Sequence, residues 1–251
     1  IQLREEICRK LDEMEQLGVI VKCDDNEASD WVNSIAFSRK SNGELRICLD
    51  PRHLNAVMKR TYHKTPTIDE ISYKLSGSAV YSKLDAKHGY WGISLTENSS
   101  KMCTFQSPAG KYRFTRLPFG LYVSQDIFQC KMDNILRQVG EGVVGIADDI
   151  IVYGKDNAEH DKALHRLMNI AKSQGLVFRA EKCKIRQASV DFFGLVWSGD
   201  GMQPDPKKCD DIANKSAPKT VQELQSFLGL VQYLSPFIPH PAAKTMTLRQ
   251  L

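Results

Sequence analysis

The stretch Val143-Val-Gly-Ile-Ala-Asp-Asp-Ile-Ile-Val-Tyr153 places two adjacent aspartates, Asp148 and Asp149, between two apolar runs. Both runs are rich in β-branched residues, which favour strands, and so short a connection favours an antiparallel hairpin. Two negative charges beside buried strands are costly without a counter-charge, and a divalent metal ion supplies one. Aspartate is also a common turn residue, so the pair alone leaves a polar turn and a metal site both open.

The composition is that of an ordinary soluble globular protein, with 42% hydrophobic and 25% charged residues. A chain of 251 residues is long enough for one or two domains with a proper core. The formal net charge of +4 is compatible with a polyanionic partner but does not require one. No run approaches the roughly 18 to 20 apolar residues of a membrane span, so no membrane partner is expected.

The seven cysteines are scattered and form no Cys-x-x-Cys pair, which predicts reduced thiols and an intracellular, cytoplasmic protein. His160 and His165 stand on a predicted helix without a cysteine nearby, so we interpret them as surface histidines rather than zinc ligands. There is no apolar signal-peptide core at the start. The chain opens on Ile1 within an apolar pattern, which predicts a fragment of a longer polypeptide.

Apolar periodicity and turn residues predict a mixture of helices and antiparallel strands, an α+β fold rather than a βαβ repeat. Capping boxes are expected at Asp156 with Glu159 and at Thr220 with Glu223. In chain order the predicted elements are a helix over 3–17, a hairpin over 31–49, a short helix over 65–77, a strand over 80–85, a hairpin over 102–115, a helix over 124–139, the aspartate hairpin, a helix over 156–175, extended segments over 176–178 and 192–197, and a helix over 220–231.

A third carboxylate, Asp85, ends a predicted strand, and the aromatic Tyr90 five residues later could wall a pocket beside it. Three carboxylates on adjacent strands form an oxygen cage for Mg²⁺, which prefers carboxylates together with substrate phosphates. Two such ions, about 3.5 to 4 Å apart, can clamp the attacking and leaving oxygens of a phosphoryl transfer. We therefore expect Asp85 to converge with Asp148 and Asp149.

The chain resembles reverse transcriptases, and most closely those of gypsy-type LTR retrotransposons. Three ordered motifs carry the resemblance: Tyr81–Asp85 with Gly89–Trp91, Arg116–Leu121, and Ile146–Gly154. Further segments match in the same order, and the resemblance covers nearly the whole chain: Leu45–Asn55, Glu181–Cys183, Phe193–Leu195, Phe227–Tyr233 and Phe237–Pro239.

The resemblance implies a right-hand polymerase with fingers, a palm built on an antiparallel sheet, and the start of the next domain. Residues 1–78 would form the fingers with the first helix. Residues 79–196 would form the palm, with an interleaved fingers segment near 91–118. Residues 197–251 would hold the primer-grip hairpin and begin the thumb or connection.

By position, Asp85, Asp148 and Asp149 would bind two Mg²⁺ ions, with Mn²⁺ as a substitute. Asp85 and Asp148 would bridge both ions, and Asp149 would support them. Arg46, with one of Arg39 or Lys40, would grip the incoming triphosphate, a role that suits the forked donors of arginine.

The nucleotide would also lie beside Ala86, Phe119 and Gly120. Tyr90 would stack under its sugar and reject a 2′-hydroxyl, so deoxynucleoside triphosphates are the expected substrates. Several positions depart from the family pattern: Ile146 stands where an aromatic is usual and is followed by the small Ala147, Gly92 stands where glutamine is usual, and Gln125 stands where proline is common.

The hairpin over Phe193–Gly201 matches the primer grip, in which Trp197, Gly199 and Gly201 are assigned and Trp197 would pack on the primer strand. Lys182 or Lys184 would supply a general acid to the pyrophosphate. Each lysine is equally plausible as a phosphate contact or a solvated side chain.

The implied function is an RNA-directed DNA polymerase of retrotransposon replication, acting on RNA and DNA template-primers in the cytoplasm, a retrotransposon particle or the nucleus. Two other interpretations stay open. One is a decayed or domesticated nucleic-acid-binding protein derived from such an enzyme, and the other is a metal-dependent nuclease. No protease, integrase or complete RNase H segment is recognisable in the sequence.

Overall fold

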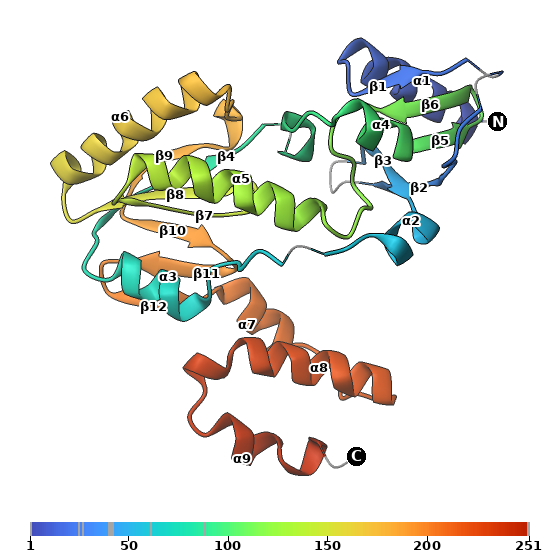
Figure 1. Cartoon of the computed structure of the whole chain (residues 1–251). Helices are drawn as coiled ribbons and strands as arrows, with labels where there is room; N and C mark the ends of the chain where they lie inside the picture. The colour runs from blue at the N-terminus through green and yellow to red at the C-terminus, as the bar shows by residue number, and fades with distance from the viewer. Residues whose placement is uncertain are drawn as a thin grey trace.

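The computed structural model describes residues 2–24, 26, 28–39, 43–60, 62–87 and 89–249. Figure 1 shows a lobe of small sheets with the N-terminus, a larger lobe built on a four-stranded sheet, and C-terminal helices that project from the larger lobe. Helices and antiparallel hairpins are mixed along the described part of the chain, which shows no βαβ repeat. Every strand pairing within its sheets is antiparallel. The predicted α+β class is confirmed.

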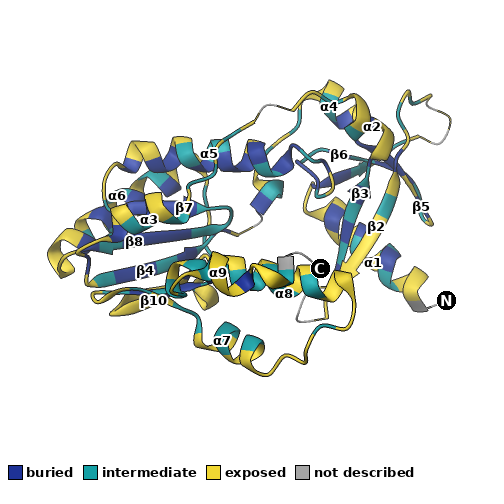
Figure 2. Ribbon diagram, turned by 90° about the horizontal axis from the view of Figure 1, so that it is seen from below, coloured by how far each residue is buried: buried dark blue, intermediate teal, exposed yellow. Residues whose placement is uncertain are grey.

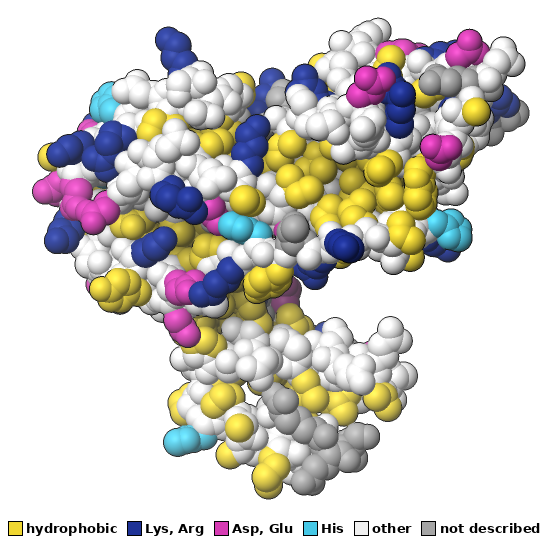
Figure 3. All heavy atoms as spheres, in the orientation of Figure 1, with side chains coloured by type: hydrophobic (Ala, Val, Ile, Leu, Met, Phe, Trp, Pro, Cys, Tyr) yellow, Lys and Arg dark blue, Asp and Glu magenta, His cyan; other side chains and the backbone are white. Residues whose placement is uncertain are grey.

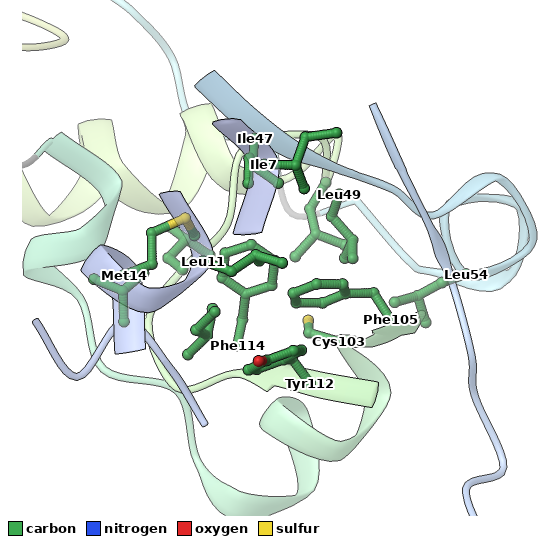
Figure 4. Close-up of a cluster of buried hydrophobic side chains, with 14 of the residues drawn as sticks. Ile7, Leu11, Met14, Ile47, Leu49, Leu54, Cys103, Phe105, Tyr112 and Phe114 are labelled. Atoms are coloured by element: carbon green, nitrogen blue, oxygen red, sulfur yellow. The ribbon is translucent and has the colours of Figure 1, made fainter. Parts of the chain in front are cut away.

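The first lobe packs segments that lie far apart in the sequence around one core. Leu11 and Met14 of the first helix are buried against Phe105 and Phe114 of the second hairpin, as Figure 4 shows. The segment near 91–118 thus shares its core with the first 58 residues, whereas the predicted domain boundaries themselves stay a prediction. The elements of this lobe are α1 (Gln2–Gln16), β1 (Ile20–Lys22), β2 (Ser34–Arg39), β3 (Leu45–Asp50), α2 (Arg52–Val57), α4 (Glu97–Met102), β5 (Thr104–Ser107) and β6 (Gly110–Phe114).

The larger lobe is built on a sheet of order β7-β8-β4-β9, with β7 at Val143–Ile146, β8 at Asp149–Gly154, β4 at Val80–Asp85 and β9 at Lys184–Gln187. Because side chains alternate along a strand, β8 contributes to two cores. Ile150 and Val152 pack with helices α5 (Ser124–Val139) and α6 (Asn157–Gln174), while Ile151 packs on the opposite face with α3 (Ile68–Leu75). The sheet is therefore covered on both faces, as the buried strands in Figure 2 show.

A second small sheet, β10 (Ser189–Phe192), β11 (Leu195–Ser198) and β12 (Gly201–Pro204), follows β9. The single extended segment predicted over 192–197 is wrong, because Phe193 and Gly194 both take positive φ and turn the chain into a hairpin. The segment predicted as extended over 176–178 forms no strand of its own: Phe178 makes an isolated antiparallel bridge with Ala86, and the next strand is β9.

The C-terminal helices are α7 (Pro206–Ala213), α8 (Val221–Tyr233) and α9 (Pro241–Thr245). The apolar side chains of α8 are only half-buried, including Leu224, Phe227 and Leu228. None of the helices described is long and apolar enough to cross a membrane.

The predicted helix starts at Asp156 and Thr220 are confirmed, with a modified capping pattern. The Asp156 carboxylate accepts from the Glu159 backbone N–H at 2.8 Å, and the Thr220 hydroxyl accepts from that of Glu223 at 3.2 Å. The reciprocal bonds begin one residue earlier than in a capping box, since the carboxylates of Glu159 and Glu223 accept from the backbone N–H groups of the residues preceding the caps.

The prediction that His160 is a surface histidine is wrong, because its side chain is fully buried at 0% exposure. Its Nε2 lies 2.8 Å from Ser82 Oγ on β4, and its Nδ1 lies 2.9 Å from a carboxylate oxygen of Asp161. Asp161 in turn pairs with the Arg186 guanidinium through two oxygens. This network links helix α6 to the strands β4 and β9 of the sheet.

The ion pair with Arg186 lowers the pKa of Asp161 to about 2, with a further contribution from the hydrogen bond to His160. A depressed carboxyl pKa adds stability that is present above the usual value of 3.8 and is lost as the pH falls toward about 2. We expect Asp161→Asn to lower the melting temperature at neutral pH, and the difference from wild type to shrink between pH 4 and pH 2. Thermal unfolding followed by circular dichroism checks this, and a constant difference across that range would contradict it.

Candidate active site

The three aspartates meet at one end of the larger sheet. In the β4–β8 ladder Asp85 is the direct partner of Asp149, and in the β7–β8 ladder Ile146 is the partner of Asp149. Residues 147 and 148 therefore form a two-residue turn, in which Ala147 takes a φ of +52°. The Ala86 N–H donates to the Asp148 carbonyl at 2.8 Å, which ties this turn to the end of β4. The predicted convergence is present in the backbone.

The Asp148 carboxylate lies half-buried between charged neighbours. Burial raises its pKa, the negative charges of Asp85 and Asp149 raise it further, and Arg179 and Arg46 oppose the shift. A Cβ atom at Gly89 would lie 3.0 Å from Asp148 Oδ1, so the glycine leaves the room that this carboxylate occupies. The aspartates are thus close enough for their charges to interact.

The two outer carboxylates each contact basic side chains. Arg179 Nη1 lies 2.9 Å from Asp85 Oδ1, and Lys182 Nζ lies 3.5 Å from Asp85 Oδ2. Lys83 Nζ lies 2.9 Å from Asp149 Oδ2 and also donates to the Asp191 carbonyl at 3.1 Å. The negative charge at this end of the sheet is therefore partly compensated by the chain's own cations.

As the side chains lie, the described part of the chain contains no cluster of three or more His, Cys, Asp or Glu residues that could hold a metal ion. The donor set nonetheless suits Mg²⁺, which prefers carboxylate oxygens and leaves room for water and phosphate ligands. Asp148 is half-buried beside two like charges, and a divalent cation would relieve that repulsion. Asp85, Asp148 and Asp149 are the residues that would hold it.

A cluster formed by Tyr90, Phe119 and Arg46 lies between the carboxylates and the first hairpin. The Arg46 guanidinium carbon lies 4.8 Å from the centroid of the Phe119 ring, and the Phe119 and Tyr90 rings are 4.7 Å apart. The Tyr90 hydroxyl donates to Gln125 Oε1 at 2.7 Å, so the residue at the usual proline position orients this ring. Gly89, which precedes Tyr90, adjoins the Asp148 carboxylate, so the structure brings Tyr90, Phe119 and Arg46 to the carboxylate end of the sheet.

Gly120 is placed where no other residue fits. Its φ is +109°, and a Cβ atom there would lie 1.8 Å from the Leu49 carbonyl oxygen. The Leu49 N–H donates to the Phe119 carbonyl at 2.8 Å, which fastens the 119–120 segment to β3. This close approach places the Phe119 ring against the Arg46 guanidinium.

Arg39 does not join Arg46, and its assignment to the triphosphate is wrong in this structure. Ser38 is the register partner of Arg46, so Arg39, one residue further along β2, faces the other side of the hairpin. Both terminal nitrogens of Arg39 pair with Glu6 on α1, at 2.9 and 2.8 Å. Lys40, the alternative, lies outside the described residues and stays a prediction.

Trp197 is also not where the resemblance placed it. The indole is only 2% exposed, packs with Tyr81 and Val190, and donates its Nε1–H to the Phe192 carbonyl at 3.0 Å. It cannot pack on a nucleic-acid strand and instead anchors the β10–β11 hairpin. Gly199 and Gly201 lie at the β11–β12 turn as expected, where Gly201 takes a φ of +107°.

Of the two candidate general acids, only Lys182 is close to the carboxylates. The Nζ atom of Lys184 lies 3.8 Å from Asp191 Oδ2. Sequence reasoning did not identify Arg179 or Lys83 as partners of the aspartates. Neither is recognisable from local sequence, because Arg179 is 94 positions from Asp85 and an isolated lysine on a strand carries no specific signal.

Comparison with known families is consistent with this geometry. The family model described as reverse transcriptase (RNA-dependent DNA polymerase) matches residues 38–197, which include all three aspartates and Arg46. The chain belongs to the reverse transcriptase family.

Proteins similar in sequence include transposon polyproteins and an uncharacterised protein. The chain is 34% identical over 232 residues to the uncharacterised protein K02A2.6 of Caenorhabditis elegans, covering 90% of this chain and 18% of that protein. It is 31% identical over 218 residues to the transposon Tf2-7 polyprotein of Schizosaccharomyces pombe, covering 86% of this chain and 16% of the polyprotein. The chain thus spans less than a fifth of the length of these relatives.

Solved structures of foamy viral protease-reverse transcriptase share the fold. One, in complex with double-stranded DNA, superposes with a TM-score of 0.90 and 25% identity over 99% of this chain and 43% of that chain. Another, in complex with an RNA/DNA hybrid, gives a TM-score of 0.86 and 24% identity over 100% of this chain and 33% of that chain. The right-hand polymerase fold predicted from the sequence is confirmed.

Proposed function

We propose that this chain is the polymerising part of an RNA-directed DNA polymerase that serves retrotransposon replication. The primer 3′-hydroxyl attacks the α-phosphorus of a deoxynucleoside triphosphate, a new phosphodiester bond forms, and pyrophosphate leaves. The observation that carries the proposal is the β4–β8 register, which places Asp85 beside Asp149 and next to the half-buried Asp148. A protein that only binds nucleic acid has no need to bring three carboxylates together.

The residues around the carboxylates supply positioning and charge. Arg46 and Phe119 bind and orient the triphosphate, and Tyr90 contacts its sugar and excludes a 2′-hydroxyl. Asp85, Asp148 and Asp149 would hold two Mg²⁺ ions, which would supply charge neutralisation for the attacking and leaving oxygens. Lys182 Nζ, 3.5 Å from Asp85 in the unliganded chain, holds a proton that the departing pyrophosphate can accept.

The template-primer is proposed to lie across the face that carries the carboxylates. Figure 3 shows that the surface is hollowed between the two upper lobes and the helices α8 and α9 below them. Related foamy viral enzymes have been solved with double-stranded DNA and with an RNA/DNA hybrid, which supports both template types for this chain. Gly199 and Gly201 at the β11–β12 turn would approach the primer backbone closely, because they lack side chains.

Arg46→Gln is expected to raise the KM for deoxynucleoside triphosphates by about 10- to 100-fold, since it removes a charge-assisted contact to phosphate. Steady-state single-nucleotide incorporation measures this effect. Arg52→Gln is a matched control, because Arg52 lies nearby on α2 but pairs with Asp50 in solvent. An equal rise in KM for both variants would remove Arg46 from the triphosphate site.

The cellular location is proposed to be the cytoplasm, within a retrotransposon particle or with access to the nucleus. None of the seven cysteines, all of which lie in the described part of the chain, takes part in a disulfide, and this supports a reducing compartment.

Extension of a DNA primer on an RNA template, with Mg²⁺ or with a chelator, tests the function. The proposal expects template-directed incorporation of deoxynucleotides that stops when the chelator is added. Template binding without incorporation, in a longer chain as well, would favour a decayed nucleic-acid-binding protein. Cleavage of the template without added deoxynucleotides would favour a nuclease.

A further inference from the structure

The segment between α2 and α3, described at residues 58–60 and 62–67 and called the strap below, runs along helix α5 (Figure 1). Two side chains fasten its described part to the helix. Arg60 Nε donates to Asp126 Oδ2 at 2.8 Å, and His63 Nε2 lies 2.6 Å from Asp133 Oδ2. The strap therefore lies in a defined register on α5.

The His63 contact continues into the protein through Gln129, which is 0% exposed. Gln129 Nε2 donates to Asp133 Oδ1 at 2.9 Å and to the Gly145 carbonyl at 3.2 Å. Gln129 Oε1 accepts from the Ala147 N–H at 2.9 Å. A continuous set of hydrogen bonds thus runs from a histidine on the strap to the turn that carries Asp148.

Asp133 and the Gly145 carbonyl together set the direction of this set of bonds, because both accept from Gln129 Nε2. An ionised carboxylate can only accept hydrogen bonds, so it requires a donor from His63 and a donor from Gln129. The Gln129 amide is thereby held with its nitrogen toward Asp133 and the Gly145 carbonyl and its oxygen toward Ala147, and Asp133 adds the second of the two acceptors. With the amide reversed, two acceptors would face each other at Asp133 and two donors at Ala147.

The Ala147 N–H is a point at which such support matters. A non-glycine residue at a φ of +52° is strained, and it persists only where its surroundings hold it. Asp148 is the next residue, so a change in the Ala147 peptide changes the direction of the Asp148 side chain.

We propose that His63 and Asp133 are positioning residues for the polymerase reaction, which act through Gln129 on the Ala147 peptide and so on the orientation of Asp148. The inference rests on the proposed function for its kinetic consequence but not for its structural one. It makes Asp133 and His63 matter for the rate of chemistry, although neither touches the substrate or the carboxylates.

Hydrogen exchange of the Ala147 amide, resolved by NMR, measures the structural consequence directly. In Asp133→Asn we expect this amide to exchange about 10-fold faster than in wild type, since the near-isosteric amide cannot accept both bonds. The amides of Ile150 and Val152, in the buried strand β8, should keep their exchange rates relative to global unfolding. His63→Ala, at a partly exposed site that tolerates truncation, should show a smaller acceleration of about threefold.

Single-turnover incorporation measures the kinetic consequence in the same variants. The kcat should fall about 10-fold in Asp133→Asn, while the KM for the deoxynucleotide stays unchanged, because only the catalytic geometry is altered. Arg60→Gln is the matched control, since it releases the same strap at its other contact. It should lower the melting temperature but leave both the kcat and Ala147 exchange at wild-type values.

The proposal would be overturned if the Ala147 amide exchanged at the wild-type rate in both Asp133→Asn and His63→Ala. It would also be overturned if Arg60→Gln showed the same Ala147 exchange rate and the same kcat as Asp133→Asn. Failure of the proposed function is a separate result. In that case wild type incorporates no nucleotide, whereas Ala147 exchange still responds to Asp133→Asn.

Discussion

Asp148→Asn is expected to reduce the rate of nucleotide incorporation by at least about 1,000-fold, which corresponds to about 4 kcal/mol of lost transition-state stabilisation. The substitution removes the central carboxylate of the three while keeping its size. Single-turnover primer extension on an RNA template measures the loss. Asp69→Asn, the same change at an exposed position on α3, should retain wild-type rates.

The same substitution should raise the melting temperature at neutral pH. Burial and the charges of Asp85 and Asp149 raise the pKa of Asp148 above 3.8, so its ionised form costs folding free energy at every pH above that raised value. Asparagine removes this cost. An inactive but more stable variant separates loss of chemistry from loss of structure, whereas a less stable variant with normal activity would contradict the role given to Asp148.

Gly120→Ala should destabilise the protein by about 3 to 5 kcal/mol and abolish nucleotide incorporation. The added Cβ would lie 1.8 Å from the Leu49 carbonyl oxygen at a φ of +109°, so the backbone must move away from β3. That movement separates Phe119 from Arg46 and disrupts the surface proposed for the triphosphate. Urea unfolding and primer extension measure the two effects.

Gly77→Ala controls for the cost of a positive φ alone. Gly77 has a φ of +74° and open space within 4 Å of an added Cβ, so we expect a loss of only about 1 to 2 kcal/mol. Equal losses at the two glycines would show that the contact with Leu49 does not matter.

Much of the fold could be predicted because the local signals are strong. The apolar periodicity and the flanking turn residues predicted the helix over Ser124–Val139 and the strand over Val80–Asp85 with the bounds that the structure has. The turn at Phe193 could not be predicted in this way. Two-residue hairpins with two positive φ angles usually carry Asn-Gly or Asp-Gly, and phenylalanine gives no such signal.

The same distinction between local and long-range signals applies to the site residues. Residue type and strand ends indicated the three aspartates, whereas Arg46 and Phe119 were assigned from the resemblance to reverse transcriptases, and the roles of all five stay predictions. The orientation of Arg39, the burial of Trp197 and the burial of His160 depend on which face of an element meets a distant segment. The Arg179–Asp85 pair joins residues 94 positions apart, and local sequence does not indicate such a contact.

Iron-mediated cleavage of the backbone tests the central claim, that Asp85, Asp148 and Asp149 hold the divalent ions of a polymerase. Fe²⁺ replaces Mg²⁺, ascorbate and peroxide generate radicals at the bound ion, and mass spectrometry locates the cuts. The account predicts cuts near residues 85 and 148, which excess Mg²⁺ suppresses and which Asp148→Asn weakens. Cuts elsewhere, or cuts at these positions that neither Mg²⁺ nor Asp148→Asn affects, would contradict it.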